Sequence, residues 1–137
     1  MYKHIMLPTD LLHEANLNKA IQTACDLAKH YGADLHLVSV SGGLPSKLVH
    51  SSTEYGERLE DMAQSLADKN GIQVEAHNIK SQDPEAELDG RLMKAIDQTG
   101  SDLVVMGSHE PGILEYVFSS HAGRLASHAK VSVFVVR

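Results

Sequence analysis

Short apolar segments alternate regularly with longer segments whose apolar residues recur every three or four positions, and this alternation is the strongest guide to the fold. The longer segments are typical of amphipathic helices. The short segments, each typical of a β-strand, are residues 3–7, 35–40, 72–76, 103–106 and 131–136. The pattern predicts an α/β fold, a three-layer sandwich in which a five-stranded parallel sheet is covered by helices on both faces.

Two of the strand segments differ in polarity, and the difference indicates where they lie in the sheet. Ile72, Val74 and Ala76 alternate with polar residues, so we expect a half-exposed strand at a sheet edge. Residues 103–106 are apolar throughout, so we expect a strand that is buried on both faces in the interior of the sheet.

The helix that follows residue 82 has two candidate starting points. Asp83 followed by Pro84 is typical of an N-cap and a first helical turn. Gly90 would then lie inside the helix, at a cost of about 1 kcal/mol relative to alanine. A helix that begins near Asp89 is the alternative.

Composition sets the size class and excludes several kinds of protein. The chain has 137 residues, of which 42% are hydrophobic, and this predicts a single domain over residues 1–137. A formal net charge of −6 disfavours nucleic acid as a partner, because phosphates attract clustered lysine and arginine. No apolar run approaches the roughly 18 residues of a membrane helix, and no signal peptide is visible. We therefore expect a cytoplasmic protein that is not embedded in a membrane.

The cysteine and histidine content argues against a metal centre. Cys25 is the only cysteine, which excludes a disulfide framework and a zinc site of paired thiolates, and its apolar neighbours predict burial. His121 and His128 stand two helical turns apart, but no third ligand accompanies them at metal spacing. We therefore expect no metal site.

A ligand site is expected at the carboxyl ends of the strands, because open parallel sheets bind ligands there, where the strand order reverses. Gly107 and Gly112 permit close approach of the backbone to a ligand. A helix that begins at Ser119-Ser120 would direct free N–H groups at a phosphate, although glycine and serine also form ordinary turns. The candidate site residues are Pro8, Thr9, Asp10, Val40, Met106, Gly107, Ser108, His109, Gly112, Ser119 and Ser120.

Three stretches of the sequence carry a family resemblance: HIMLPTD at residues 4–10, DLVVMGSH at residues 102–109 and VFVV at residues 133–136. They are similar to the corresponding parts of universal stress proteins, and the similarity covers essentially the whole chain. The resemblance implies a Rossmann-like sheet of the adenine nucleotide alpha hydrolase-like type. It also implies a cytoplasmic regulatory module that acts in the stress response.

The same resemblance implies an adenine nucleotide as the ligand, with a departure in the phosphate-binding part. ATP-binding members of the family carry Gly, two residues, Gly, nine residues and then Gly followed by Ser or Thr. Gly107 matches the first position, whereas Glu110 replaces the second glycine and Ser119-Ser120 replaces the final pair one residue early. Asp10 and Val40 match the positions beside ribose and adenine. The implied ligand is ATP or AMP, with Mg²⁺ only where ATP binds.

The surroundings of Gly107 favour binding over catalysis. No lysine and no pair of metal-binding carboxylates stands beside it in the sequence. We therefore predict a non-catalytic binding module. The alternative is an enzyme on the same fold that slowly hydrolyses a nucleotide or transfers a nucleotidyl group.

The last strand predicts a partner. Val131, Val133 and Val135 alternate on this strand, and an open apolar edge strand aggregates unless it is paired. The family resemblance likewise implies antiparallel pairing of this strand across a two-fold axis. We predict a homodimer through this last strand, Val131 to Val136.

Overall fold

Strands and helices alternate along the chain in the computed structural model, which describes residues 1–11, 17–42, 52–107 and 115–137. The strands are β1 (His4–Pro8), β2 (Asp34–Ser41), β3 (Val74–Lys80), β4 (Leu103–Gly107) and β5 (Ser132–Val136). The helices are α1 (Asn18–Tyr31), α2 (Ser52–Asn70), α3 (Pro84–Thr99) and α4 (Glu115–His128). The predicted alternation is confirmed.

The strands form one parallel five-stranded sheet in the order β3-β2-β1-β4-β5. β3 lies at one edge and is partly exposed along its length, as its alternating polarity predicted. β4 lies inside the sheet, and its first four residues are buried. Both predictions about strand position are therefore confirmed, although β3 begins at Val74 rather than at Ile72.

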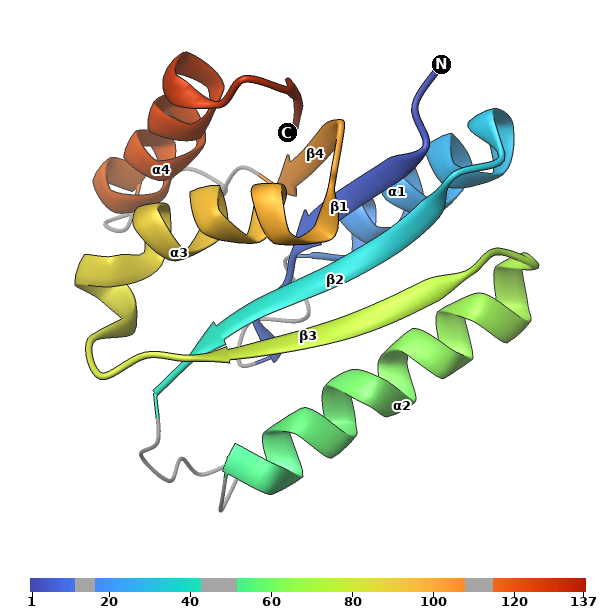
Figure 1. Cartoon of the computed structure of the whole chain (residues 1–137), viewed down its shortest axis with the longest axis horizontal. Helices are drawn as coiled ribbons and strands as arrows, with labels where there is room; N and C mark the ends of the chain where they lie inside the picture. The colour runs from blue at the N-terminus through green and yellow to red at the C-terminus, as the bar shows by residue number, and fades with distance from the viewer. Residues whose placement is uncertain (12–16, 43–51, 108–114) are drawn as a thin grey trace.

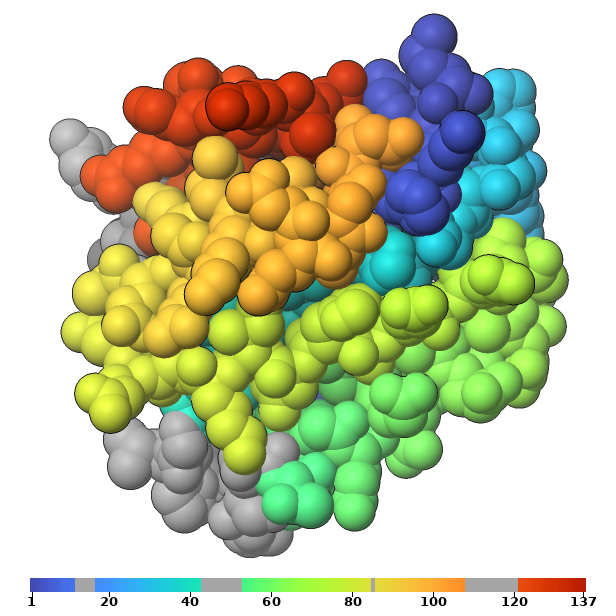
Figure 2. Space-filling view, in the orientation of Figure 1, coloured from blue at the N-terminus to red at the C-terminus, as the bar shows by residue number. Residues whose placement is uncertain are grey.

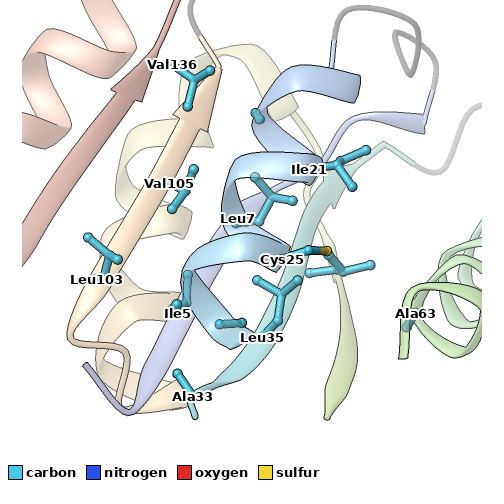
Figure 3. Packing of buried hydrophobic residues seen from close by; sticks show 14 of the residues in the cluster. Ile5, Leu7, Ile21, Cys25, Ala33, Leu35, Ala63, Leu103, Val105 and Val136 are labelled. Carbon is cyan, nitrogen blue, oxygen red and sulfur yellow. The ribbon is translucent and has the colours of Figure 1, made fainter. Parts of the chain in front are cut away.

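The helices cover both faces of the sheet, which confirms the three-layer sandwich (Figure 1). Helices α1 and α2 pack on one face, where Cys25 and Leu59 meet sheet residues such as Leu35, and Figure 3 shows part of this cluster. Helices α3 and α4 pack on the other face, where Leu92 and Leu125 contact strand residues such as Val104. None of the helices in the described ranges is long and apolar enough to cross a membrane.

Helix α3 begins at Pro84, so the alternative start near Asp89 is wrong. The Asp83 carboxylate accepts a hydrogen bond from the backbone N–H of Ala86 at 3.2 Å, which satisfies one of the free donors of the first turn. Proline needs no such partner because it has no N–H. The cap therefore offsets the cost of Gly90, which lies inside the helix with no neighbouring atom near its missing side chain.

Candidate functional site

The strand order reverses between β1 and β4. From β1 the chain moves outward through β2 to β3, and it then crosses to β4 on the opposite side of β1 before reaching β5. β1 and β4 are adjacent and parallel, so their carboxyl ends, at Pro8 and Gly107, lie at the same end of the sheet. This is the position at which open α/β sheets bind their ligands.

Thr9 shapes the exit of the chain from β1. Its side chain is buried, its backbone N–H donates to the Val38 carbonyl at 2.8 Å, and its hydroxyl donates to the Leu7 carbonyl at 2.9 Å. The first bond extends the pairing of β1 with β2 by one residue. Both the backbone N–H and the hydroxyl proton of Thr9 are therefore engaged with main-chain carbonyls of β1 and β2.

Tyr55 joins the ends of β1 and β2 from helix α2. Its phenol oxygen accepts a hydrogen bond from the backbone N–H of Leu11 at 3.2 Å and lies 2.5 Å from the Ser39 hydroxyl oxygen. Burial raises the pKa of Tyr55, and the nearby negative charge of Asp10 raises it further, so the phenol stays neutral. Tyr55 therefore positions the segment that carries Asp10.

Sequence reasoning did not find this role for Tyr55. The residue stands in the apolar stripe of α2, and periodicity assigns it only to the core. A phenol in an otherwise aliphatic stripe was the available signal, since a buried tyrosine hydroxyl needs a hydrogen-bond partner.

The other described candidates lie at or near the carboxyl ends of the strands. Val40 occupies the next-to-last position of β2, and its backbone pairs in register with Ile79 of β3. Met106 is buried and Gly107 is half-buried at the end of β4. Asp10 is half-exposed just beyond β1. The fold thus brings the predicted residues of three strands to one edge.

Comparison with known proteins identifies the family. The model of the universal stress protein family matches residues 1–137. The chain belongs to this family. The chain is 28% identical to universal stress protein G of Shigella flexneri over the full length of both proteins.

Solved structures of other universal stress proteins share the fold. A universal stress protein from Archaeoglobus fulgidus superimposes with a TM-score of 0.74 at 17% identity over the whole of both chains. A structure of the universal stress protein from Archaeoglobus fulgidus in complex with dAMP superimposes with a TM-score of 0.69 at 19% identity, covering 99% of this chain and 98% of that one. These likenesses confirm the Rossmann-like arrangement of the sheet.

One expectation about the phosphate-binding part of this universal stress protein is wrong. Helix α4 begins at Glu115, not at Ser119-Ser120. Both serines lie beyond the first four residues of the helix, where backbone N–H groups donate to carbonyls one turn earlier. Serine inside a helix lowers helix stability by only about 0.5 kcal/mol relative to alanine, so a helix can continue through both residues. The free N–H groups belong to residues 115–118. Ser108, His109 and Gly112 lie outside the described residues.

The two histidines of α4 have different surroundings. His121 is buried and its Nδ1 pairs with the Asp89 carboxylate, which also accepts a hydrogen bond from Arg124 at 3.2 Å. His128 is exposed, and its Nδ1 donates to the Arg124 carbonyl at 2.9 Å. A groove of about 220 Å³ runs beside them, lined by Asp89, Gly90, Met93, Arg124, Leu125 and His128. It lies between α3 and α4.

Within the described ranges, two groups of side chains have the spacing of metal ligands, and both are at the opposite half of the strands. One consists of His4, Asp34 and His36, and the other of His36, Glu75 and His77. Sequence analysis missed them because it sought ligands close together along one helix. The signal was present as two carboxylate-x-His pairs on consecutive strands, which alternation places on one face.

Proposed function

We propose that this universal stress protein is a non-catalytic cytoplasmic regulatory module that binds an adenine nucleotide, ATP or AMP, at the carboxyl edge of the sheet. The observation that supports the proposal is that β1, which ends at Pro8 just before Asp10, and β4, which ends at Gly107, are adjacent at the reversal of strand order. The dAMP held by the Archaeoglobus fulgidus protein of the same fold supports an adenine nucleotide as the ligand class.

The arrangement of the edge suggests how the ligand lies. Adenine would lie beside the backbone of Val40 and Thr9, and the Asp10 carboxylate would accept hydrogen bonds from the ribose hydroxyls. The phosphates would extend from Pro8 and Met106-Gly107 across Ser108, His109 and Gly112 toward the helix start at residues 115–118. The free N–H groups at the start of α4 carry the positive end of the helix dipole and suit an anion. Mg²⁺ would accompany ATP only.

Calorimetric titration with AMP and ATP tests the proposal directly. Asp10→Ala should weaken AMP binding about tenfold to a hundredfold, because a hydrogen bond to a charged group is worth roughly 1.5–3 kcal/mol. Asp97→Ala, at an exposed position of α3, is the matched control and should bind normally. Absence of binding by the wild-type protein would show that the site is vestigial.

Selectivity between nucleotides tests the phosphate-binding part. Glu110 replaces a family glycine, and its carboxylate should repel additional phosphates, so AMP should bind at least as tightly as ATP. Glu110→Gly should raise ATP affinity more than AMP affinity. A strong wild-type preference for ATP that Glu110→Gly leaves unchanged would show that Glu110 points away from the phosphates.

The competing function is slow nucleotide hydrolysis or nucleotidyl transfer. A binding module should return bound ATP intact after long incubation, as measured by mass spectrometry of the released ligand. Stoichiometric formation of ADP or AMP that is lost in Asp10→Ala would favour the enzyme instead.

We further propose a homodimer through β5, at residues 131–136. β5 is an edge strand, and two of its large apolar side chains are exposed, Phe134 at 47% and Val135 at 36%. An exposed apolar edge is a template for pairing with a second strand. Antiparallel pairing of two copies of β5 would cover both edges at once.

A further inference from the structure

A cluster of imidazoles and carboxylates lies on the amino half of strands β1, β2 and β3, away from the proposed nucleotide edge. We name it the histidine–carboxylate cluster, and its members are His4, Asp34, His36, Glu75 and His77. The sheet register assembles it, since His4 pairs with Asp34 and His36 pairs with Glu75 on neighbouring strands. Figure 2 shows the start of the chain in blue, β2 in cyan and β3 in lime side by side on one face.

Strand alternation places all members of the cluster on the face that α3 and α4 cover. Met6 and Val38 stand two residues beyond His4 and His36, and both belong to the apolar cluster on that face. Because β3 is an edge strand, the cluster opens toward solvent at one side. The Glu75 side chain is 62% exposed and that of His77 is 35% exposed, whereas that of His36 is only 6% exposed.

Three ligand atoms of the cluster have the mutual spacing that a small metal ion requires. His36 Nδ1 lies 3.0 Å from His77 Nε2 and 3.7 Å from Glu75 Oε2, and His77 Nε2 lies 3.7 Å from the same Glu75 oxygen. A tetrahedral Zn²⁺ ion with bonds of roughly 2.0–2.1 Å holds its ligands about 3.3 Å apart. Each pair is within a few tenths of an ångström of that separation.

The other nitrogen of His36 supplies an independent observation. Nε2 of this buried ring has no hydrogen-bond partner among the described residues, although Asp34 Oδ2 lies 3.5 Å away. The Asp34 carboxylate is itself held by His4 Nδ1 at 2.6 Å. Histidines that bind metals donate their second ring N–H to a carboxylate, and a metal on Nδ1 would place the proton of His36 on Nε2, on the side of Asp34.

The facing ring nitrogens of His36 and His77 lie at hydrogen-bond distance, 3.0 Å apart. In the metal-free protein one of these two nitrogens carries the proton of this bond. With that proton on the other nitrogen of its ring, both facing nitrogens keep a lone pair that can bind a cation.

We propose that His36, His77 and Glu75 form a binding site for a divalent transition-metal ion of the Zn²⁺ type, with Asp34 as the residue that positions His36. Two imidazoles and one carboxylate suit Zn²⁺ and Co²⁺, whereas Mg²⁺ prefers oxygen ligands alone. The fourth coordination position faces solvent beside Glu75 and His77. The site is separate from the proposed nucleotide edge and does not depend on it.

Titration of untagged, chelator-treated protein with Zn²⁺ and Co²⁺ in the absence of nucleotide tests the site. The wild-type protein should bind one equivalent, and Co²⁺ should give the intense visible absorption of a four-coordinate ion. His77→Ala and Glu75→Gln change partly exposed side chains and should lower Zn²⁺ affinity roughly tenfold or more. His30→Ala removes an exposed histidine of α1, on the other face of the sheet, and should bind as wild type does.

The positioning role of Asp34 has its own readout. Asp34→Asn should lower the affinity about tenfold to a hundredfold while the Co²⁺ absorption keeps its four-coordinate character. Zn²⁺ affinity that is equal in wild-type protein, His77→Ala and Glu75→Gln would overturn the proposal. Equal losses in His30→Ala and His77→Ala, or Mg²⁺ binding as strong as Zn²⁺ binding, would also overturn it. Thermal melts in chelator establish that each variant is folded.

Discussion

Tyr55 shows how one buried polar side chain can join two segments beside the candidate site. Its phenol oxygen serves both the Leu11 backbone and the Ser39 hydroxyl, on two segments that end at the same sheet edge. A buried polar group that loses its partner costs about 1–3 kcal/mol, whereas an exposed group turns to water instead. Burial of Tyr55 and its partners therefore raises the cost of losing these hydrogen bonds.

We predict that Tyr55→Phe lowers the free energy of unfolding by about 1–3 kcal/mol, because the buried Ser39 hydroxyl loses its partner. It should also weaken nucleotide binding, since the segment that carries Asp10 is held less firmly. Tyr2→Phe is the matched control, because the Tyr2 hydroxyl donates to Ser132 at an exposed position. Urea unfolding of both variants measures the difference. Equal effects would show that the Tyr55 hydroxyl does not matter.

Cys25 should be chemically inert in the folded protein. It is 1% exposed among the apolar residues of α1 and the sheet, and burial raises the pKa of its thiol above the usual 9.0. As the pH rises through 9, the thiol of Cys25 loses its proton in the unfolded chain before it does so in the folded chain. This difference progressively lowers the free energy of unfolding. Labelling with a charged alkylating reagent at pH 8 should follow global unfolding. Rapid labelling of native protein would contradict this expectation.

At the scale of elements, helix ends depend on both capping and context. Asp83 and Pro84 start α3 at the predicted position, and Gly100 ends it with a left-handed backbone at φ 66°. Gly90 lies within the same helix without such a backbone requirement. The glycine that ends α3 is therefore required by its backbone conformation, whereas the glycine inside the helix is not.

We predict that Gly90→Ala raises the free energy of unfolding by about 0.8–1 kcal/mol, because alanine loses less backbone entropy in a helix and meets no neighbouring atom there. Gly100→Ala should lower it by about 1–2 kcal/mol, because its left-handed conformation strains any residue with a Cβ atom. Denaturant unfolding of the pair provides the measurement. Destabilisation by Gly90→Ala would indicate that the helix is distorted at that position.

At the scale of the whole molecule, an all-parallel sheet separates two ends with different chemistry. The carboxyl ends of β1 and β4 meet where strand order reverses, and the histidine–carboxylate cluster lies across the amino halves of β1, β2 and β3. The edge strand β5 lies apart from the cluster, beyond β4. Nucleotide, metal and partner would therefore occupy three separate parts of the molecule.

We predict that Phe134→Lys makes the protein monomeric where the wild-type protein forms the proposed homodimer, because charged side chains on an edge strand oppose strand pairing. Phe134 is preferable to the partly buried Val133, whose side chain packs against the core. Light scattering at micromolar concentration measures the mass, with Lys130→Ala as a control at an exposed site just before β5. A wild-type monomer, or a Phe134→Lys dimer that is still folded, would contradict the proposed interface.

The sequence by itself determined the order of elements, the edge position of β3 and the buried position of β4. These features follow from local periodicity, because burial of one face or of two leaves a pattern within a few consecutive residues. The family motifs likewise pointed to the carboxyl ends of β1 and β4, because Pro8 and Gly107 are the last residues of these strands.

Only the tertiary structure decided the start of α4, the role of Tyr55 and the existence of the histidine–carboxylate cluster. Ser119-Ser120 resembles a helix cap, but α4 begins at Glu115 and continues through both serines, which cost only about 0.5 kcal/mol each inside a helix relative to alanine. Tyr55 and Ser39 meet across sixteen residues, and His36 and His77 meet across forty-one. Such contacts depend on strand order and register, and both arise from packing that joins distant parts of the chain.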